Sequence, residues 1–298
     1  MELIDFEVLS SYSFFIAAIG TVVLSMTAGA IGCITVLKGQ SLIGDAIGHA
    51  TFPGIVLSFM LFLQKDPILL IIGAIFSGAI AFILIQMVRN NSKLDLDAIL
   101  AIVMSSFFGL GMVLKSYIQG NENYSAASQS GLQNYIFGQA AYIMKEDVKL
   151  ILLVSIPTII LISVFYKEIK IFLFDETYSK TIGLNTKVLY GIILLITIGI
   201  IAVGLKIVGT ILISSLLIIP SITALQWSEK FSSVLLIAAV IGGISAFIGT
   251  YISTVYSGMS TGPVIILIMS IFSFISLIFG PRGMILNIKR RSRVDEWN

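Results

Sequence analysis

Nine apolar runs, each about long enough to cross a bilayer, decide what this chain can fold into. A helix needs roughly 17 to 25 apolar residues to cross about 30 Å of hydrocarbon. The runs are residues 14–36, 42–63, 67–88, 96–114, 148–165, 188–203, 207–225, 231–252 and 262–279. Only Gly204-Leu205-Lys206 separates the sixth run from the seventh, so the alternative is eight spans with those two as one interrupted element.

The composition excludes a soluble globular protein and indicates one all-α polytopic membrane domain over residues 1–298. Apolar residues make up 57% of the chain and charged residues 11%, whereas roughly a quarter of the residues in soluble proteins are charged. The mean hydropathy is +1.03. The first residues are acidic, which is atypical of a cleavable signal peptide, so we expect the first span to remain in the protein.

The basic residues predict how the spans are oriented. If nine spans alternate with the C-terminus in the cytoplasm, 13 of the 18 Lys and Arg residues lie on the cytoplasmic side. The positive-inside rule favours this arrangement, which puts the N-terminus outside. We then expect the basic tail, residues 289–293, to contact anionic lipid, and residues 115–145 to form the largest outer segment.

Asp45 and His49 form the most informative pair in the chain. His49 is the only histidine, and it follows Asp45 by four residues inside an apolar run. On a helix this spacing places both side chains on one face. Ionisable groups in hydrocarbon cost roughly 2.5 to 3.5 kcal/mol each, so the pair indicates a function, and a carboxylate with an imidazole can hold a divalent cation. Gly44 and Gly48 add a G-x-x-x-G spacing that allows close helix packing at the site.

Other interpretations of the pair stay open on the residues alone. Asp45 and His49 can form a buried hydrogen-bonded pair that fixes helix register, or can relay protons in a transporter that needs no ATP. Ser41, Thr51 and Cys33 are near enough in the sequence to be further ligands. Because Cys33 is the single cysteine, an internal disulfide is excluded, and a buried inert thiol is the more typical role.

This chain lacks the sequence motifs of several function classes. There is no G-x-x-x-x-G-K-[S/T], so the chain has no P-loop and any ATP-driven step needs a second protein. One histidine is too few for a His-rich zinc hydrolase site, and no nucleophile-plus-base motif indicates an intramembrane enzyme. The basic residues are spread over loops, which argues against nucleic-acid binding. We therefore expect a transport subunit and no enzyme.

Two polar segments interrupt the apolar pattern on the predicted cytoplasmic side. Residues 174–183 are typical of a short amphipathic helix that ends at a glycine, with a solvated connector as the alternative. In the run at residues 207–225, Pro220 is expected to close the span near its inner end. A surface helix with an interfacial tryptophan, Trp227, is expected to follow it.

Four stretches together carry a family resemblance that extends over nearly the whole chain. The most specific is Gly-Asp-Ala-x-x-His-Ala followed by Pro-Gly at residues 44–54. The others are residues 135–139, Asp175-Glu176 with Gly183, and residues 208–220. They resemble the permease subunits of bacterial ABC importers for manganese, zinc and iron. Gly48 departs from the serine that is usual before the family's histidine, which leaves the ligand pair intact but removes a nearby hydroxyl.

The resemblance implies partners and a helix order. It implies a homodimer of permease chains on two cytoplasmic ATPases, supplied by an extracellular metal-binding lipoprotein. The helix order resembles that of the vitamin and siderophore importer permeases, in which inner loops dock on the ATPase. By that analogy the coupling residues are first Gln226, Trp227, Ser228, Glu229 and Lys230, and second Asp175, Glu176 and Gly183.

The number of ligands connects the pair with the implied homodimer. One Asp45 and one His49 are too few ligands for tight capture, whereas a two-fold axis doubles them. Two carboxylates and two imidazoles suit Mn²⁺, Zn²⁺ or Fe²⁺. The residues at 44–50 and 137–139 resemble those of the manganese members more than those of the zinc members. We therefore expect Mn²⁺ as the transported ion, with no permanently bound cofactor. The rival hypothesis is an ATP-independent, proton-linked metal transporter or channel.

Overall fold

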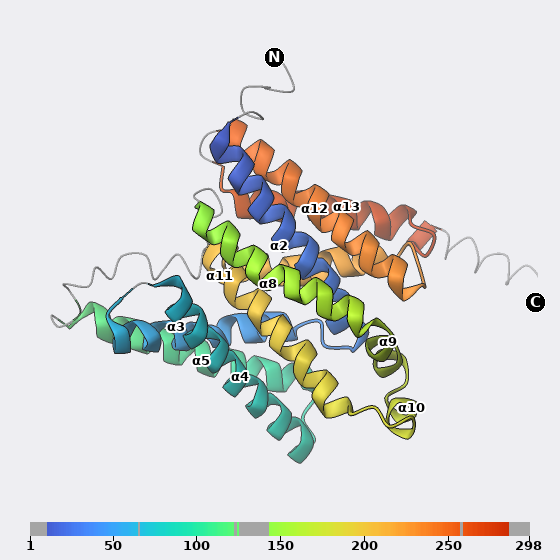
Figure 1. Ribbon diagram of the computed structural model, residues 1–298, viewed down its shortest axis with the longest axis horizontal. Coiled ribbons are helices and arrows are strands. Elements are labelled where there is room, and N and C mark those ends of the chain that lie inside the picture. Colours follow the sequence, from blue (N-terminus) through green and yellow to red (C-terminus); the bar gives the residue numbers. More distant parts are fainter. Residues whose placement is uncertain (1–10, 65, 122–123, 125–142, 257–258, 286–298) are drawn as a thin grey trace, which may run out of the picture. The chain divides into compact units, whose positions relative to one another are not determined.

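The computed structural model describes residues 11–64, 66–121, 124, 143–256 and 259–285, and these form α-helices joined by short connections (Figure 1). Within these residues, eight helices are long and apolar enough to cross a membrane. The predicted all-α polytopic membrane fold is therefore confirmed, with eight as the span count. The predictions for residues 135–139 and for the tail at 289–293 lie outside the described residues.

The spanning helices follow the apolar runs of the sequence. They are α2 (Tyr12–Leu37), α3 (Ile43–Phe62), α4 (Pro67–Asn91), α5 (Leu96–Gln119), α8 (Lys145–Val164), the first part of α11 (Thr186–Leu225), α12 (Phe231–Val255) and α13 (Thr261–Phe279). The short helices α9 (Tyr166–Phe174) and α10 (Glu176–Thr181) connect α8 to α11. Large apolar side chains remain exposed, with Leu61 at 78% and Phe76 at 69%. Such faces are expected where lipid replaces water.

The chain divides into two compact units, each built from segments that are far apart in the sequence. The first comprises Met1–Ser41, Ala140–Ser155 and Ser215–Asn298. The second comprises Leu42–Gln139 and Ile156–Ser214. The Asp45/His49 pair therefore belongs to the second unit, and the turn at residues 226–230 belongs to the first.

In the first unit, α2 packs along α12 through small residues (Figure 1). A Cβ atom on Gly29 of α2 would lie 2.9 Å from the carbonyl oxygen of Ala238, and one on Gly242 of α12 would lie 2.7 Å from that of Ser25. Both distances are shorter than side chains tolerate. Glycine at these positions therefore lets the two backbones approach closely, as small residues do in membrane helix pairs.

In the second unit, α3 packs against both α4 and α5 (Figure 1). Gly54 of α3 and Gly73 of α4 lie so close that a Cβ atom on either would overlap the backbone carbonyl of the other. Ser77 of α4 adds a hydrogen bond, donated by its hydroxyl to the carbonyl oxygen of Ala50 over 2.6 Å. These contacts fix the rotation of α3, and with it the direction of the side chains in its first two turns.

The predicted sixth and seventh spans form one helix, α11, which has a break inside it. Gly209 has φ 79° and ψ 173°, non-helical values that are essentially restricted to glycine. The part before the break, Thr186–Thr210, is long enough to span, whereas Leu212–Leu225 is an apolar helix of only roughly 20 Å. The prediction of one interrupted element is confirmed, and that of a separate full-length seventh span is wrong.

Two local predictions at the end of α11 are also wrong. Pro220 lies inside the helix, which continues to Leu225. Membrane helices tolerate an internal proline where neighbouring groups satisfy the freed carbonyl. The segment that follows is no surface helix, because residues 226–230 form a turn between α11 and α12. Both flanking helices extend so far along the chain that too few residues remain for another helix.

Candidate metal site and coupling segments

Asp45 and His49 lie in the first two turns of α3 and share one face of the helix. Asp45 Oδ1 lies 3.7 Å from His49 Nε2. The side chains are 36% and 23% exposed, respectively, so this chain shelters both of them only in part. The structure therefore shows the i, i+4 juxtaposition that the spacing predicts.

The separation of Asp45 and His49 suits two ligands of one cation better than a direct hydrogen bond. A hydrogen bond between nitrogen and oxygen is about 2.7 to 3.2 Å long. Two ligands bonded at about 2.1 Å to a tetrahedral ion lie roughly 3.4 Å from each other. A small side-chain rotation would bring Oδ1 and Nε2 from 3.7 Å to that spacing. The pair can therefore form one edge of a metal coordination shell.

Asp45 also forms a hydrogen bond with a serine from a distant part of the sequence. Ser214 of α11 is buried, and its hydroxyl donates a hydrogen bond of 2.9 Å to Asp45 Oδ1. The same hydroxyl lies 3.0 Å from the carbonyl oxygen of Thr210, one turn earlier in α11. The sequence does not predict this contact. Its only signal is a pair of polar residues, Ser214-Ser215, in an apolar run just after Gly209.

The imidazole of His49 is packed by an aromatic ring and has one nitrogen without a partner. The ring of Phe108 meets it edge-on, with centroids 5.1 Å apart at 84°. Nδ1 is buried and has no hydrogen-bond partner within the described part of the chain. Pro53, four residues later, has no N–H and so cannot bond to the backbone carbonyl of His49. Nε2 is the ring nitrogen on the face shared with Asp45.

One chain supplies too few ligands to enclose a cation. The described residues contain no group of three or more His, Cys, Asp and Glu side chains able to hold a metal. Two of the further candidates are engaged elsewhere: the Thr51 hydroxyl donates to the Gly48 carbonyl over 2.7 Å, and the Cys33 thiol to the Val234 carbonyl over 3.7 Å. A complete coordination shell therefore needs ligands from another source.

Gly44 and Gly48 are buried on α3 beside the pair. A Cβ atom on Gly48 would meet its nearest neighbour, Cγ2 of Ile201, at 3.9 Å, which is an ordinary contact. Packing within this chain therefore leaves room for a larger residue at position 48. Close packing of two copies of α3 through these glycines stays a prediction.

The turn at residues 226–230 is braced against the end of α13. The indole Nε1 of Trp227 donates a hydrogen bond of 2.9 Å to Ser276 Oγ. The backbone carbonyl of Gln226 accepts a 3.2 Å hydrogen bond from the amide of Arg282, whose guanidinium pairs with Glu229. A movement imposed on this turn would therefore be transmitted to α13.

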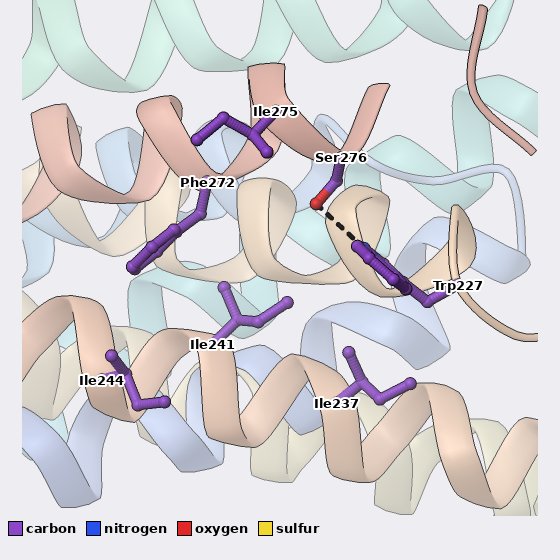
Figure 2. A pocket seen from close by; sticks show the side chains of 7 residues that line it. All are labelled: Trp227, Ile237, Ile241, Ile244, Phe272, Ile275 and Ser276. Carbon is purple, nitrogen blue, oxygen red and sulfur yellow. Dashed lines mark hydrogen bonds between the residues drawn. The ribbon is translucent and has the colours of Figure 1, made fainter. Parts of the chain in front are cut away.

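Trp227 also closes one end of an apolar pocket between α12 and α13 (Figure 2). The pocket has a volume of about 400 Å³. Its wall consists of Trp227, Ile237, Ile241, Ile244, Phe272, Ile275 and Ser276. Because Trp227 and Ser276 bond to each other, the pocket offers almost only apolar surface.

The second candidate coupling segment, Asp175 to Gly183, is a capped helical turn, as the sequence predicts. Asp175 is the N-cap of α10, and its Oδ1 accepts a 2.7 Å hydrogen bond from the amide of Tyr178. Glu176 pairs with Lys180 over 2.9 Å. Gly183, with φ +81°, reverses the chain just after the helix. The segment is thus a compact, largely exposed surface element before α11.

Comparisons by family, by sequence and by structure each match most of this chain. The family described as "ABC 3 transport family" matches residues 11–280. The manganese transport system membrane protein MntC of Bacillus subtilis is 37% identical over 276 residues, which cover 92% of this chain and 63% of that protein. The zinc transport system membrane protein TroC of Treponema pallidum is 35% identical over 286 residues, which cover 96% and 95%. The solved structure of PsaBC from Streptococcus pneumoniae in complex with Fab contains a similar chain, with a TM-score of 0.82 at 30% identity over 95% of this chain and 98% of that one.

Proposed function

The chain belongs to the ABC 3 transport family, and from this premise we propose that it is the membrane-spanning permease of an ATP-driven importer of a divalent transition metal. It is a multi-pass membrane protein whose relatives are named as membrane proteins of metal transport systems. The observation that carries the proposal is the carboxylate and imidazole 3.7 Å apart on one face of the spanning helix α3. Asp45 and His49 are the metal ligands.

The incomplete ligand set supports a homodimer. Two copies of Asp45 and His49 brought together by a two-fold axis give two oxygen and two nitrogen ligands. The α3 helices would approach through Gly44 and Gly48, which carry no side chain to separate them. The cation then binds at the axis, enclosed by both chains.

The partners follow from what the chain lacks and from where its polar segments lie. The sequence has no P-loop, so hydrolysis of ATP belongs to a separate cytoplasmic ATPase. The turn at residues 226–230 contacts that ATPase first, and Asp175 to Gly183 second. An extracellular metal-binding lipoprotein delivers the ion. We propose that the chain has its N-terminus outside and its C-terminus in the cytoplasm of a bacterial plasma membrane. Eight crossings alone would put both termini on one side, so this topology requires the short helix Leu212–Leu225 to return the chain to the cytoplasmic side.

We take Mn²⁺ as the transported ion. Carboxylate oxygens and imidazole nitrogens accept Mn²⁺, Fe²⁺ and Zn²⁺, and intrinsic affinity would favour Zn²⁺ over Mn²⁺. One relative is named for manganese and another for zinc, so the names alone do not decide between these ions. Selectivity for Mn²⁺ must therefore come from the geometry of the dimer or from the delivering protein.

The proposal is tested by uptake of radioactive Mn²⁺ into proteoliposomes that contain the chain and its ATPase, with metal-loaded lipoprotein outside. We expect uptake that requires ATP and the lipoprotein, and that excess free Zn²⁺ does not abolish. A control ATPase that binds ATP without hydrolysing it should give no uptake. Uptake without ATP or lipoprotein would instead establish the proton-linked carrier or channel.

A further inference from the structure

The oxygen of Asp45 that faces His49 is also the oxygen that Ser214 holds. Ser214 Oγ lies 2.9 Å from Oδ1, and His49 Nε2 lies 3.7 Å from the same atom. An ionised carboxylate only accepts hydrogen bonds, so the serine hydroxyl must be the donor. This contact joins α11 to α3 across 169 residues of sequence.

The Ser214 hydroxyl has two hydrogen-bond acceptors within reach, and the Asp45 carboxylate is the stronger of the two. The other acceptor is the backbone carbonyl of Thr210, one turn earlier in α11, at 3.0 Å. A serine in a membrane helix commonly has such a carbonyl of the preceding turn within reach. A hydroxyl has one proton, so a full bond to Asp45 competes with this local bond. Hydrogen bonds to charged groups are the stronger kind, which favours the carboxylate.

The break at Gly209 lets Ser214 occupy this position. Ser214 belongs to the short helix Leu212–Leu225, whose start is set by the non-helical backbone of Gly209. An unbroken α11 would carry Ser214 along the axis of Thr186–Thr210 and turn its side chain elsewhere. Broken membrane helices commonly contribute to ion sites in this manner.

We propose that Ser214 is a positioning residue that fixes the Asp45 carboxylate toward His49 and thereby sets the affinity of the pair for a divalent cation. The proposal rests on the proposed function, because it assumes that Asp45 and His49 bind the transported metal. Oδ1 of Asp45 is 2.9 Å from the serine, and one hydrogen bond there removes rotation from a side chain that is 36% exposed. The remaining lone pairs stay free for the ion.

The test measures Mn²⁺ affinity of the full chain, assembled with its ATPase in nanodiscs. In Ser214→Ala we expect Mn²⁺ binding to be about 10-fold weaker, which is typical when a hydrogen bond to a metal ligand is lost. Ser214→Thr keeps the hydroxyl and should restore affinity to near the parent value. The matched control is Thr197→Val, because Thr197 is buried in the same helix and its hydroxyl donates only to the Ile193 carbonyl, over 2.7 Å. It should leave the affinity unchanged.

A double-mutant cycle separates positioning from a general structural role. If Ser214 acts through Asp45, adding Ser214→Ala to Asp45→Ala causes no further loss of Mn²⁺ affinity. Equal affinity in the parent and in Ser214→Ala overturns the inference, as does an equal loss in both backgrounds. If the proposed function is wrong, the result differs, because Asp45→Ala would then bind Mn²⁺ as well as the parent does.

Discussion

At the scale of single residues, His49 offers two nitrogens that differ in their surroundings. Nε2 faces Asp45 at 3.7 Å, whereas Nδ1 is buried without a partner within the described residues. Phe108 covers the ring edge-on and limits its rotation. The metal should therefore bind at Nε2, and the side-chain length at position 49 should decide whether it binds.

We predict that His49→Gln retains part of the Mn²⁺ uptake and that His49→Asn retains none. The amide of glutamine reaches about where Nε2 lies, whereas the shorter asparagine places its amide near Nδ1. Uptake into proteoliposomes at rising Mn²⁺ concentration checks this, with His49→Ala as the reference for complete loss. Better uptake by the asparagine variant would show that Nδ1 is the ligand.

At the scale of elements, the broken helix α11 explains why part of the structure was predictable and part was not. Run length alone predicts where spans lie, and α12 begins at Phe231 as expected. The sequence places the interruption at Gly204-Leu205-Lys206, between two apolar runs, whereas the non-helical backbone lies at Gly209, inside the run 207–225. The Asp45/His49 pair follows from local spacing. The bond from Ser214 to Asp45 does not, because it spans 169 residues.

We predict that Gly209→Ala destabilises the protein and that Gly191→Ala, in the same helix, does not. The φ of 79° at Gly209 is strained for any other residue, and such strain costs about 1 to 3 kcal/mol. A Cβ atom on Gly191 would meet nothing within 4 Å, and alanine favours a helix by roughly 0.5 to 1 kcal/mol over glycine. The midpoint of thermal unfolding in detergent checks both variants. Equal midpoints for the two variants would show that the break at Gly209 is not required.

At the scale of the whole molecule, the proposed contact of the turn at residues 226–230 with an ATPase depends on which end of each span faces the cytoplasm. The distribution of basic residues favours an orientation with the connection between α4 and α5 inside and the end of α5 outside. The same orientation puts the turn at residues 226–230 where an ATPase can reach it. Reversal of the topology would rule out the proposed coupling role of that turn.

Single-cysteine labelling in intact cells checks this orientation. Asn121→Cys should react with a membrane-impermeant thiol reagent added outside, whereas Ser92→Cys should react only after the cells are opened. The parent protein serves as the control, because Cys33 is fully buried and should not react. The opposite labelling pattern would invert the proposed topology.

The central claim is that Asp45 and His49 bind the transported ion, and one measurement tests it most directly. ATP-dependent Mn²⁺ uptake is compared between the parent and Asp45→Ala, each reconstituted with the ATPase and supplied by loaded lipoprotein. Equal ATP hydrolysis by both preparations shows that assembly is intact. We predict that uptake by Asp45→Ala falls to the level of liposomes without ATP. Uptake at the parent rate by this assembled variant would contradict the account.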